Sequence, residues 1–219
     1  MKVPLTILAL GLLAVSWLRA DGLFSQTFTG GAIPDNPVGA VFGGDFTAAD
    51  SNDQIVGVTV DLNITGGIAS GFYVYLIAPD NSMTVLLSQP GVTMENSFGN
   101  LSSGLDIRLA DGGTTITASS DLNIGTGSPY QAAETLSNFG TLDNPGGSAD
   151  GNWDLYLAEL TNDGETPTLN SWSLNVTVQS SAVPEPCSVA LLGLSGITLI
   201  TWRKYLGQTL KIKKRHRGL

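Results

Sequence analysis

Apolar and polar residues alternate along several short segments in the middle of this 219-residue chain. An alternation with a period of two places the apolar side chains on one face of an extended strand and the polar ones on the other. The clearest segments with this period cover residues 56–64, 105–109, 153–157 and 172–178. Each of them is therefore predicted to be a half-buried β-strand.

A hairpin is predicted after the first of these strands. Residues 72–77 are almost wholly apolar, which is typical of a central strand; the turn sequence Pro79-Asp80-Asn81 follows, and residues 83–87 supply the returning strand. Between residues 21 and 183, 22 of 163 residues are glycine, and no helical period of useful length occurs. Short strands separated by frequent turn residues predict an all-β sandwich, and about 160 residues can bury its core without disulfides.

The first twenty residues have the pattern of a secretory signal peptide. Lys2 supplies a positive charge, residues 3–18 are mostly apolar, and Ala20 is a small residue before the polar chain. Sixteen helical residues reach about 24 Å, which is less than the ~30 Å hydrocarbon core of a bilayer. Cleavage after Ala20 is expected, so that the mature chain begins outside the cytoplasm. A signal anchor that is never cut is the alternative.

A second apolar segment lies near the other end of the chain. Residues 187–202 carry no charge, and the basic residues Arg203 and Lys204 follow directly. A basic cluster after an apolar helix stays in the cytoplasm, so the sequence predicts one transmembrane helix with a basic cytoplasmic tail. A buried core helix is the alternative. It would show an apolar stripe, whereas this segment is apolar all round.

A short proline motif, Val183-Pro184-Glu185-Pro186, stands immediately before this segment. Its two prolines exclude a helix and leave an extended peptide at the membrane boundary, within reach of a processing enzyme. This motif, the apolar segment and the basic cluster together resemble the PEP-CTERM sorting signal of Gram-negative bacteria. The resemblance implies exosortase, a membrane processing enzyme, as a partner, with transient anchoring in the inner membrane and association with exopolysaccharide or biofilm. Because the basic tail runs on to Leu219, a retained single-pass anchor with a cytoplasmic C-terminus is the alternative.

The middle of the chain resembles the proprotein-convertase P-domain. The similar segments are Ile33-Pro34-Asp35, Ala78-Pro79-Asp80, residues 151–157 and residues 162–174. The resemblance implies a jelly-roll β-sandwich, which in that family lies beside a subtilisin-type protease and stabilises it. This chain has no room for such a protease, so a protease partner would be separately encoded.

These features divide the chain into six parts. They are a signal peptide (1–20), an N-terminal lead (21–32), a P-domain-like β-sandwich (33–178), a linker with the Pro-Glu-Pro motif (179–186), a transmembrane helix (187–202) and a basic cytoplasmic tail (203–219).

The net charge and the scarcity of histidine and cysteine limit the kinds of site that the predicted sandwich can contain. Residues 21–183 contain eighteen acidic residues and one base, Arg108, so their net charge is −17. This excludes a basic nucleic-acid-binding surface. The chain has one histidine, His216, and one cysteine, so the predicted sandwich contains no Ser-His-Asp triad, zinc site or disulfide framework. No catalytic residue is assigned; a carboxylate pair that hydrolyses glycosides is the remaining enzymatic hypothesis.

Two kinds of ligand suit the predicted sandwich. Acidic side chains near glycines suit calcium, which prefers oxygen ligands; the candidate ligands are Asp143, Asp150 and Asp163, with solvated acidic loops as the alternative. Aromatic side chains could stack on sugar rings, with ordinary cross-strand packing as the alternative. The candidates for sugar stacking are Tyr73, Tyr75 and Tyr130.

The sequence therefore predicts a non-enzymatic, exported protein of the cell surface or extracellular matrix, associated with exopolysaccharide after transient membrane anchoring. A segment of charge −17 repels like-charged surfaces unless divalent cations bridge them, which favours a calcium-dependent matrix. The second hypothesis is a membrane-anchored accessory domain that stabilises a separate protease. The third is an enzyme that acts on glycans.

Overall fold

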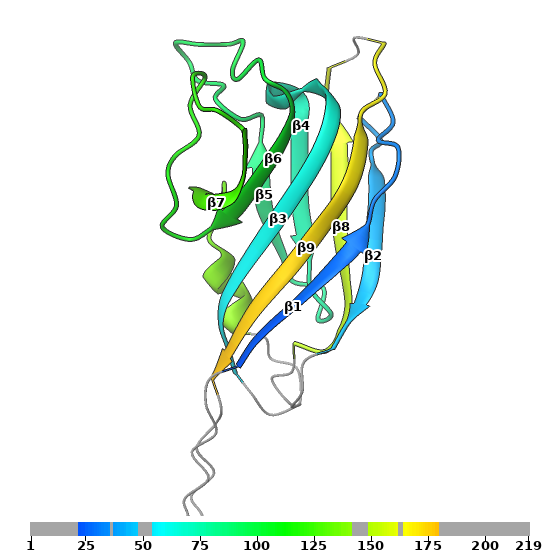
Figure 1. Ribbon diagram of the computed structural model, residues 1–219, viewed down its shortest axis with the longest axis vertical. Helices are drawn as coiled ribbons and strands as arrows, with labels where there is room; N and C mark the ends of the chain where they lie inside the picture. Colours follow the sequence, from blue (N-terminus) through cyan, green and yellow to red (C-terminus); the bar gives the residue numbers. More distant parts are fainter. Residues whose placement is uncertain (1–21, 36, 48–53, 142–148, 162–163, 180–219) are drawn as a thin grey trace, which may run out of the picture. The chain divides into compact units, whose positions relative to one another are not determined.

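Two β-sheets packed face to face make up the part of the chain that the structure describes (Figure 1). The structure is a computed structural model and describes residues 22–35, 37–47, 54–141, 149–161 and 164–179. The predicted all-β sandwich is confirmed.

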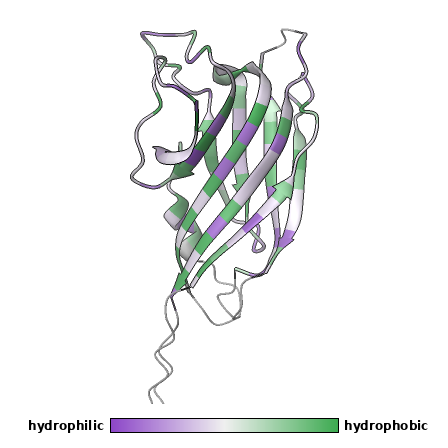
Figure 2. Cartoon of the chain, in the orientation of Figure 1, coloured by the Kyte–Doolittle hydropathy of each residue, from purple (hydrophilic) through white to green (hydrophobic). Residues whose placement is uncertain are grey.

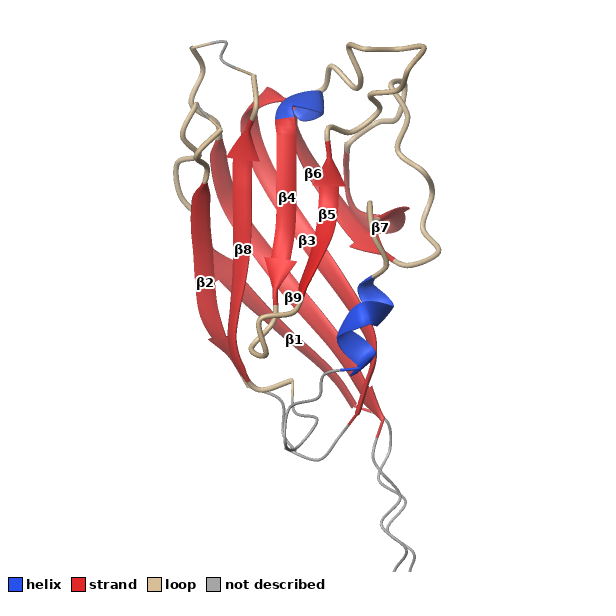
Figure 3. Cartoon of the chain, turned by 180° about the vertical axis from the view of Figure 1, so that it is seen from behind, coloured by secondary structure: helices blue, strands red, loops and turns tan. Residues whose placement is uncertain are grey.

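The larger sheet contains five strands in the spatial order β1-β9-β3-β6-β7. Their bounds are β1 Gly22–Thr29, β9 Thr168–Gln179, β3 Gln54–Ile68, β6 Ser103–Ala110 and β7 Asn123–Gln131. The smaller sheet, in front in Figure 3, has the order β2-β8-β4-β5. Its strands are β2 Ala40–Phe46, β8 Gly151–Glu159, β4 Phe72–Ile77 and β5 Met83–Ser88. Two 3-10 helices, η1 Ala69–Gly71 and η2 Leu136–Thr141, complete the described elements.

The core lies between the inner faces of the two sheets, where every second strand residue points. Figure 2 shows the resulting apolar bands across the strands of the larger sheet. Both tryptophans of the sandwich are fully buried: Trp172 stacks on Phe28 with ring centroids 4.3 Å apart, and Trp153 meets Phe139 edge-on at 5.2 Å. Burial of such large rings is a main source of the stability of a sandwich of this size.

The predicted β4–β5 hairpin is confirmed, and its turn has the expected chemistry. Asn81 takes a positive φ of 65°, which asparagine tolerates better than most residues. The carboxylate of Asp80 accepts a hydrogen bond from the backbone N–H of Ser82 at 2.9 Å. The local sequence therefore fixes this turn.

The sandwich begins earlier than the sequence indicated. Residues 22–29, expected to be a lead, form β1, which pairs with β9 from Gly22 opposite Val178 to Thr29 opposite Ser171. The sandwich thus starts at Gly22 rather than at residue 33. This edge strand carries only two phenylalanines on its half-buried face, so its period of two is weak.

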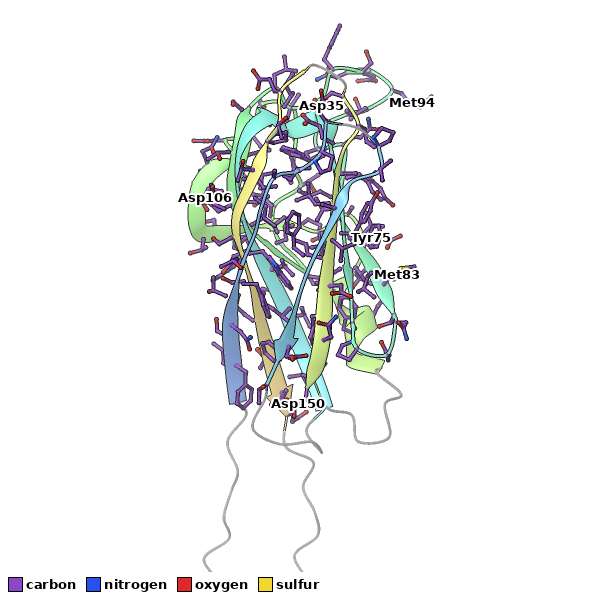
Figure 4. All side chains as sticks on the ribbon, turned by 90° about the vertical axis from the view of Figure 1, so that its right-hand side faces the viewer. Asp35, Tyr75, Met83, Met94, Asp106 and Asp150 are labelled. Atoms are coloured by element: carbon purple, nitrogen blue, oxygen red, sulfur yellow. The ribbon has the colours of Figure 1, made fainter. Side chains whose placement is uncertain are left out.

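Both ends of the sandwich leave it on the same side, because the first residue of β1 lies opposite Val178 near the end of β9 (Figure 1). The opposite end carries η1 and the long loop of residues 89–102. In Figure 4, Asp35 and Met94 lie at this opposite end, whereas Asp150 lies near the chain ends of the sandwich.

Several predictions fall outside the described residues. They concern the signal peptide, the motif Val183-Pro184-Glu185-Pro186, the apolar segment 187–202, the basic pair Arg203 and Lys204, and the candidate calcium ligands Asp143 and Asp163. Among the residues that are described, no helix has the length and hydropathy needed to cross a membrane.

Candidate ligand-binding groove

A groove of about 360 Å³ lies beside β5, toward the end of the sandwich that is remote from its chain ends. Three separate segments line it, at residues 86–93, 115–116 and 131–133. They come from the end of β5 and its following loop, the loop between β6 and β7, and the end of β7. The volume falls near the lower end of the ~300–1,000 Å³ typical of small-molecule sites.

The lining of the groove combines buried apolar residues with accessible polar residues and the accessible apolar residues Val92, Ile116 and Ala133. The buried lining residues are Leu86, Leu87, Pro90 and Ala132. Hydroxyl and carboxamide side chains that are exposed or half-buried stand around them: Ser88, Gln89, Thr93, Thr115 and Gln131. None of the lining residues has a charged side chain. This groove therefore offers hydrogen bonds and apolar contact, but no acid, base or ion-pair partner.

The wall of the groove formed by residues 86–93 includes an unusual backbone conformation at Gln89. Gln89 has a positive φ of 50°, which is uncommon for a residue other than glycine, asparagine or aspartate. Its N–H donates to the carbonyl of Phe72 at 3.0 Å, and its own carbonyl accepts from the N–H of Val92 at 3.1 Å. These two bonds hold the strained residue between β5 and the loop that follows.

Asn100 anchors the far side of the same loop. Its side chain is only 1% exposed, and its Nδ2 donates to the carbonyls of Thr117 at 2.9 Å and Ser120 at 2.8 Å. Its Oδ1 accepts from the N–H of Ser102 at 3.0 Å, and its N–H donates to the carbonyl of Pro90 at 2.9 Å. One buried amide thus joins the two loops that form opposite walls of the groove.

The other wall, formed by residues 115–116 and 131–133, is held by the pairing of Thr114 with the end of β7. The N–H of Thr114 donates to the carbonyl of Pro129 at 3.0 Å, and the carbonyl of Thr114 accepts from the N–H of Gln131 at 2.9 Å. Tyr130, predicted as an exposed sugar-stacking residue, is instead 7% exposed, and its hydroxyl donates to the carbonyl of Asp121 at 2.6 Å. Its ring packs in the core, because the Tyr130 side chain points into the sandwich from β7.

The residues after β7 cover part of the free edge of β5. The N–H of Ala133 donates to the carbonyl of Leu86, and the N–H of Glu134 donates to the carbonyl of Val85, both at 2.9 Å. The Glu134 carboxylate accepts a hydrogen bond from the N–H of Val85, also at 2.9 Å. These bonds satisfy backbone groups that an edge strand would otherwise expose.

A second surface feature is a row of side chains across the outer face of the smaller sheet, here called the aromatic row. Strand pairing aligns its members directly, in the order Val41, Tyr156, Tyr75 and Val85. The rings of Tyr75 and Tyr156 stack with centroids 4.5 Å apart and an angle of 18°. Figure 4 shows Tyr75 on the side of the sandwich, together with Met83.

The tyrosines of this face pack on one another. Tyr73 meets Tyr75 edge-on, with ring centroids 6.2 Å apart. Burial, followed by the nearby hydroxyls of Tyr156 and Tyr73, raises the pKa of Tyr75 above its usual value. The hydroxyl of Tyr156 donates to the carbonyl of Val38 at 3.0 Å. Cross-strand packing, the alternative to sugar stacking, therefore describes Tyr75 and Tyr156, because each ring covers a face of the other.

The single base of the sandwich is already engaged. Arg108 on β6 forms two hydrogen bonds with Asp61 on β3, and this contact raises the pKa of the guanidinium further. Asn175 donates a third hydrogen bond to Asp61 at 3.2 Å. The pair lies on the outer face of the larger sheet, so among the described residues no basic side chain approaches the groove.

Of the three predicted calcium ligands, only Asp150 lies among the described residues, where it directly precedes β8. Among the described residues, no three His, Cys, Asp or Glu side chains form a group that could hold a metal ion.

Sequence reasoning did not find the groove, and no motif marks it. Its lining comes from three segments whose closeness depends on the pairing of β6 with β7 and on the buried Asn100. The one local signal is the sequence Gln89-Pro90-Gly91, which is typical of a turn but does not identify a ligand site.

Comparisons with known proteins give only a distant structural likeness. No family model matches the sequence, and no curated protein matches it significantly. The serine protease of Aeromonas sobria is similar in structure, with 15% identity, a TM-score of 0.45, and coverage of 74% of this chain and 28% of that chain. The same protease in complex with its chaperone ORF2 gives 14% identity, a TM-score of 0.45, and coverage of 75% and 28%. The chain thus spans 28% of the length of these structures.

Proposed function

We propose that this chain is a non-enzymatic, exported protein of the cell surface or extracellular matrix, sorted through its C-terminal signal and associated with exopolysaccharide. The sequence supports export through residues 1–20 and sorting through the motif Val183-Pro184-Glu185-Pro186. An exosortase-type enzyme and the inner membrane are its partners during sorting, and calcium bridging between acidic surfaces is an accompanying proposal.

The observation that best supports this proposal is the placement of the groove relative to the two ends of the sandwich. Gly22 and Val178 pair at one end, whereas the loop 89–102 and the groove lie toward the other. The point at which the chain leaves β9 is therefore remote from the groove. This arrangement suits a module that is held at one end and binds a ligand at the other.

The uncharged lining of the groove supports a binding role over an enzymatic one. General acid–base catalysis needs a titratable side chain within hydrogen-bond reach of the reacting atoms, and glycoside hydrolysis needs two carboxylates. The lining of the groove consists only of apolar, hydroxyl and carboxamide side chains and glycine. A ligand in this groove is bound without an acid or base beside it.

The strand order supports the assignment of the sandwich as a P-domain-like jelly roll. Without β7, the two sheets have the orders β1-β9-β3-β6 and β2-β8-β4-β5. A jelly roll of eight strands, in which the chain crosses between two four-stranded sheets as two Greek keys, has this arrangement. In this assignment β7 is an addition that pairs in parallel with β6 and supplies one wall of the groove.

The intact mass of the protein from its native host tests the sorting proposal. We expect a mature chain that begins near Asp21 and ends near residues 184–187, with or without an added group. A double variant, Pro184→Ala with Pro186→Ala, is expected to retain the C-terminal segment, whereas Ser181→Ala, outside the motif, is expected to be processed normally. A wild-type mass that extends to Leu219 would overturn sorting and leave a single-pass anchor.

The aromatic row favours a second candidate, an accessory module that stabilises a separately encoded protease. It crosses all four strands of the smaller sheet, and Val41 at its end is 59% exposed. The other three members, Tyr156, Tyr75 and Val85, are half-buried. A partly exposed row of apolar and aromatic groups suits a protein partner. We expect Val41→Ser to release a co-purifying subtilisin-type protease if this function holds, whereas Leu23→Ser, at a 70% exposed site on β1, is expected to have no effect. If no protease co-purifies with the wild type, this candidate is rejected.

A further inference from the structure

We propose that the groove between residues 86–93, 115–116 and 131–133 is a binding site for an uncharged oligosaccharide. This inference rests on the proposed association with exopolysaccharide, because it names the class of glycan and the residues that bind it. It does not depend on C-terminal processing, which concerns residues that follow the sandwich in the sequence.

The polar groups of the lining match a polyhydroxyl ligand. A sugar hydroxyl both donates and accepts hydrogen bonds, and so do the side chains of Ser88, Thr115 and the carboxamides of Gln89 and Gln131. The exposed or half-buried apolar residues of the lining, Val92, Ile116 and Ala133, supply contact for the C–H surface of a sugar ring. A lining that combines apolar contact with a few polar groups is the usual composition of a small-molecule site.

The charge distribution selects a neutral ligand. An anionic glycan would need a basic partner, but the only base in residues 21–183, Arg108, is paired with Asp61 on the outer face of the larger sheet. A cationic glycan would need a carboxylate in the lining, and none is present. The neighbouring carboxylate of Glu134 is already bonded to the N–H of Val85. The surrounding negative field further opposes acidic glycans.

The walls are held in place before any ligand binds. Asn100 joins the loops at Pro90 and at residues 117–120 through three hydrogen bonds, two of them from its side chain, and its Oδ1 accepts a fourth from the N–H of Ser102. Gln89 keeps a positive φ although glycine would adopt it at lower cost. Strained backbone conformations cluster at ligand sites, so the positive φ of Gln89 supports a ligand contact at this position of the lining.

A peptide strand is the competing occupant, since peptides add to free sheet edges through backbone hydrogen bonds. Here the N–H of Val85 and the carbonyls of Val85 and Leu86 are already bonded to residues 133–134. The edge of β5 is therefore covered beside the groove, which leaves side-chain recognition as the means of binding.

Calorimetric titration of the full-length chain tests the inference, in a zwitterionic detergent without a sugar headgroup. The probes are neutral hexasaccharides built on glucose, mannose or galactose, an oligogalacturonate hexamer as the acidic probe, a chitosan hexamer as the cationic probe, and an extended hexapeptide. We expect binding of at least one neutral hexasaccharide and none of the charged probes or the peptide. Failure of every neutral hexasaccharide to bind, or preference for a charged probe or the peptide, would overturn the inference.

Groove variants locate the binding site. Ala133→Trp places a large ring at an exposed lining position and is expected to weaken binding about tenfold or more. Gln131→Leu keeps the side-chain size but removes the amide, and is expected to weaken binding about fivefold. Leu23→Trp, at an exposed site on β1, is the matched control and leaves binding unchanged. Unchanged affinity in both groove variants, with melting curves like the wild type, would place the glycan elsewhere and reject the groove.

The outcomes separate this inference from the proposed function. A mature mass ending near residue 186 together with no neutral-glycan binding would keep the sorting proposal and reject the groove as a glycan site. Binding to the groove together with a mass that extends to Leu219 would keep the glycan site and reject sorting.

Discussion

Arg108 and Asp61 face each other on paired strands and form two hydrogen bonds, Nε to Oδ1 at 2.6 Å and Nη2 to Oδ2 at 2.8 Å. Arg108 is the only base in residues 21–183, so this pair uses the one positive charge that the sandwich has. The acidic character of the domain is therefore not locally offset at any other site within that range. Recognition of a ligand must come from uncharged groups or from carboxylates.

We expect the Arg108–Asp61 pair to contribute about 1 kcal/mol to the free energy of unfolding. It is partly exposed, with 34% of the arginine side chain and 16% of the aspartate side chain accessible, but it is joined by two bonds. A double-mutant cycle with Arg108→Met and Asp61→Asn measures this coupling by urea unfolding. The coupling should shrink in 1 M salt; a coupling near zero at low salt would contradict the prediction.

Loss of the Asn100 side chain should destabilise the sandwich strongly. Asn100→Leu leaves the carbonyls of Thr117 and Ser120 and the N–H of Ser102 without the bonds they now have. Because Asn100 is only 1% exposed, water cannot replace those bonds. We therefore expect a loss of about 2–4 kcal/mol in the free energy of unfolding. Asn96→Leu, in the same loop but half-buried, is the control and should cost less.

The long, regular strands could be predicted from the sequence because their inner faces are uninterrupted rows of apolar side chains. The segments at 56–64, 153–157 and 172–178 lie in β3, β8 and β9, which form the middle of the two sheets. The strands that were not predicted carry glycine or proline: β2 contains Gly43 and Gly44, and β7 contains Pro129 with two glycines. In these strands the pairing with a neighbour, rather than the local pattern, determines the conformation.

The candidate site was less predictable than the fold, for a related reason. Tyr130 has the same sequence signal as Tyr73 and Tyr75, yet the register of β7 turns its ring into the core while β4 presents the other two outward. A one-residue change in register exchanges the faces of a strand, and the sequence of β7 has too weak a period to fix that register. The groove depends on the same register, because Gln131 follows Tyr130.

Replacement of Gln89 by glycine should stabilise the folded chain. Gln89→Gly removes the cost of a positive φ, so we expect the free energy of unfolding to rise by up to about 1 kcal/mol. The matched control is Asn81→Gly in the β4–β5 turn, where asparagine already tolerates the conformation and the gain should be smaller. Chemical denaturation of both variants checks this. A loss of stability in Gln89→Gly would show that the side chain supports the fold.

The raised pKa of Tyr75 predicts how stability changes in alkaline solution. Burial favours the neutral phenol in the folded state, so the unfolded chain, with a pKa of about 10, ionises first. The contribution is fully present below pH 10 and is lost as the pH rises through the higher folded pKa. Tyr75→Phe cannot ionise, so its free energy of unfolding should fall less steeply above pH 10 than that of the wild type. Tyr156→Phe instead removes the bond to the carbonyl of Val38 and should lower stability by about 1 kcal/mol already at pH 7. Equal slopes above pH 10 in the wild type and in Tyr75→Phe would mean that the phenol of Tyr75 ionises as readily in the folded chain as in the unfolded one.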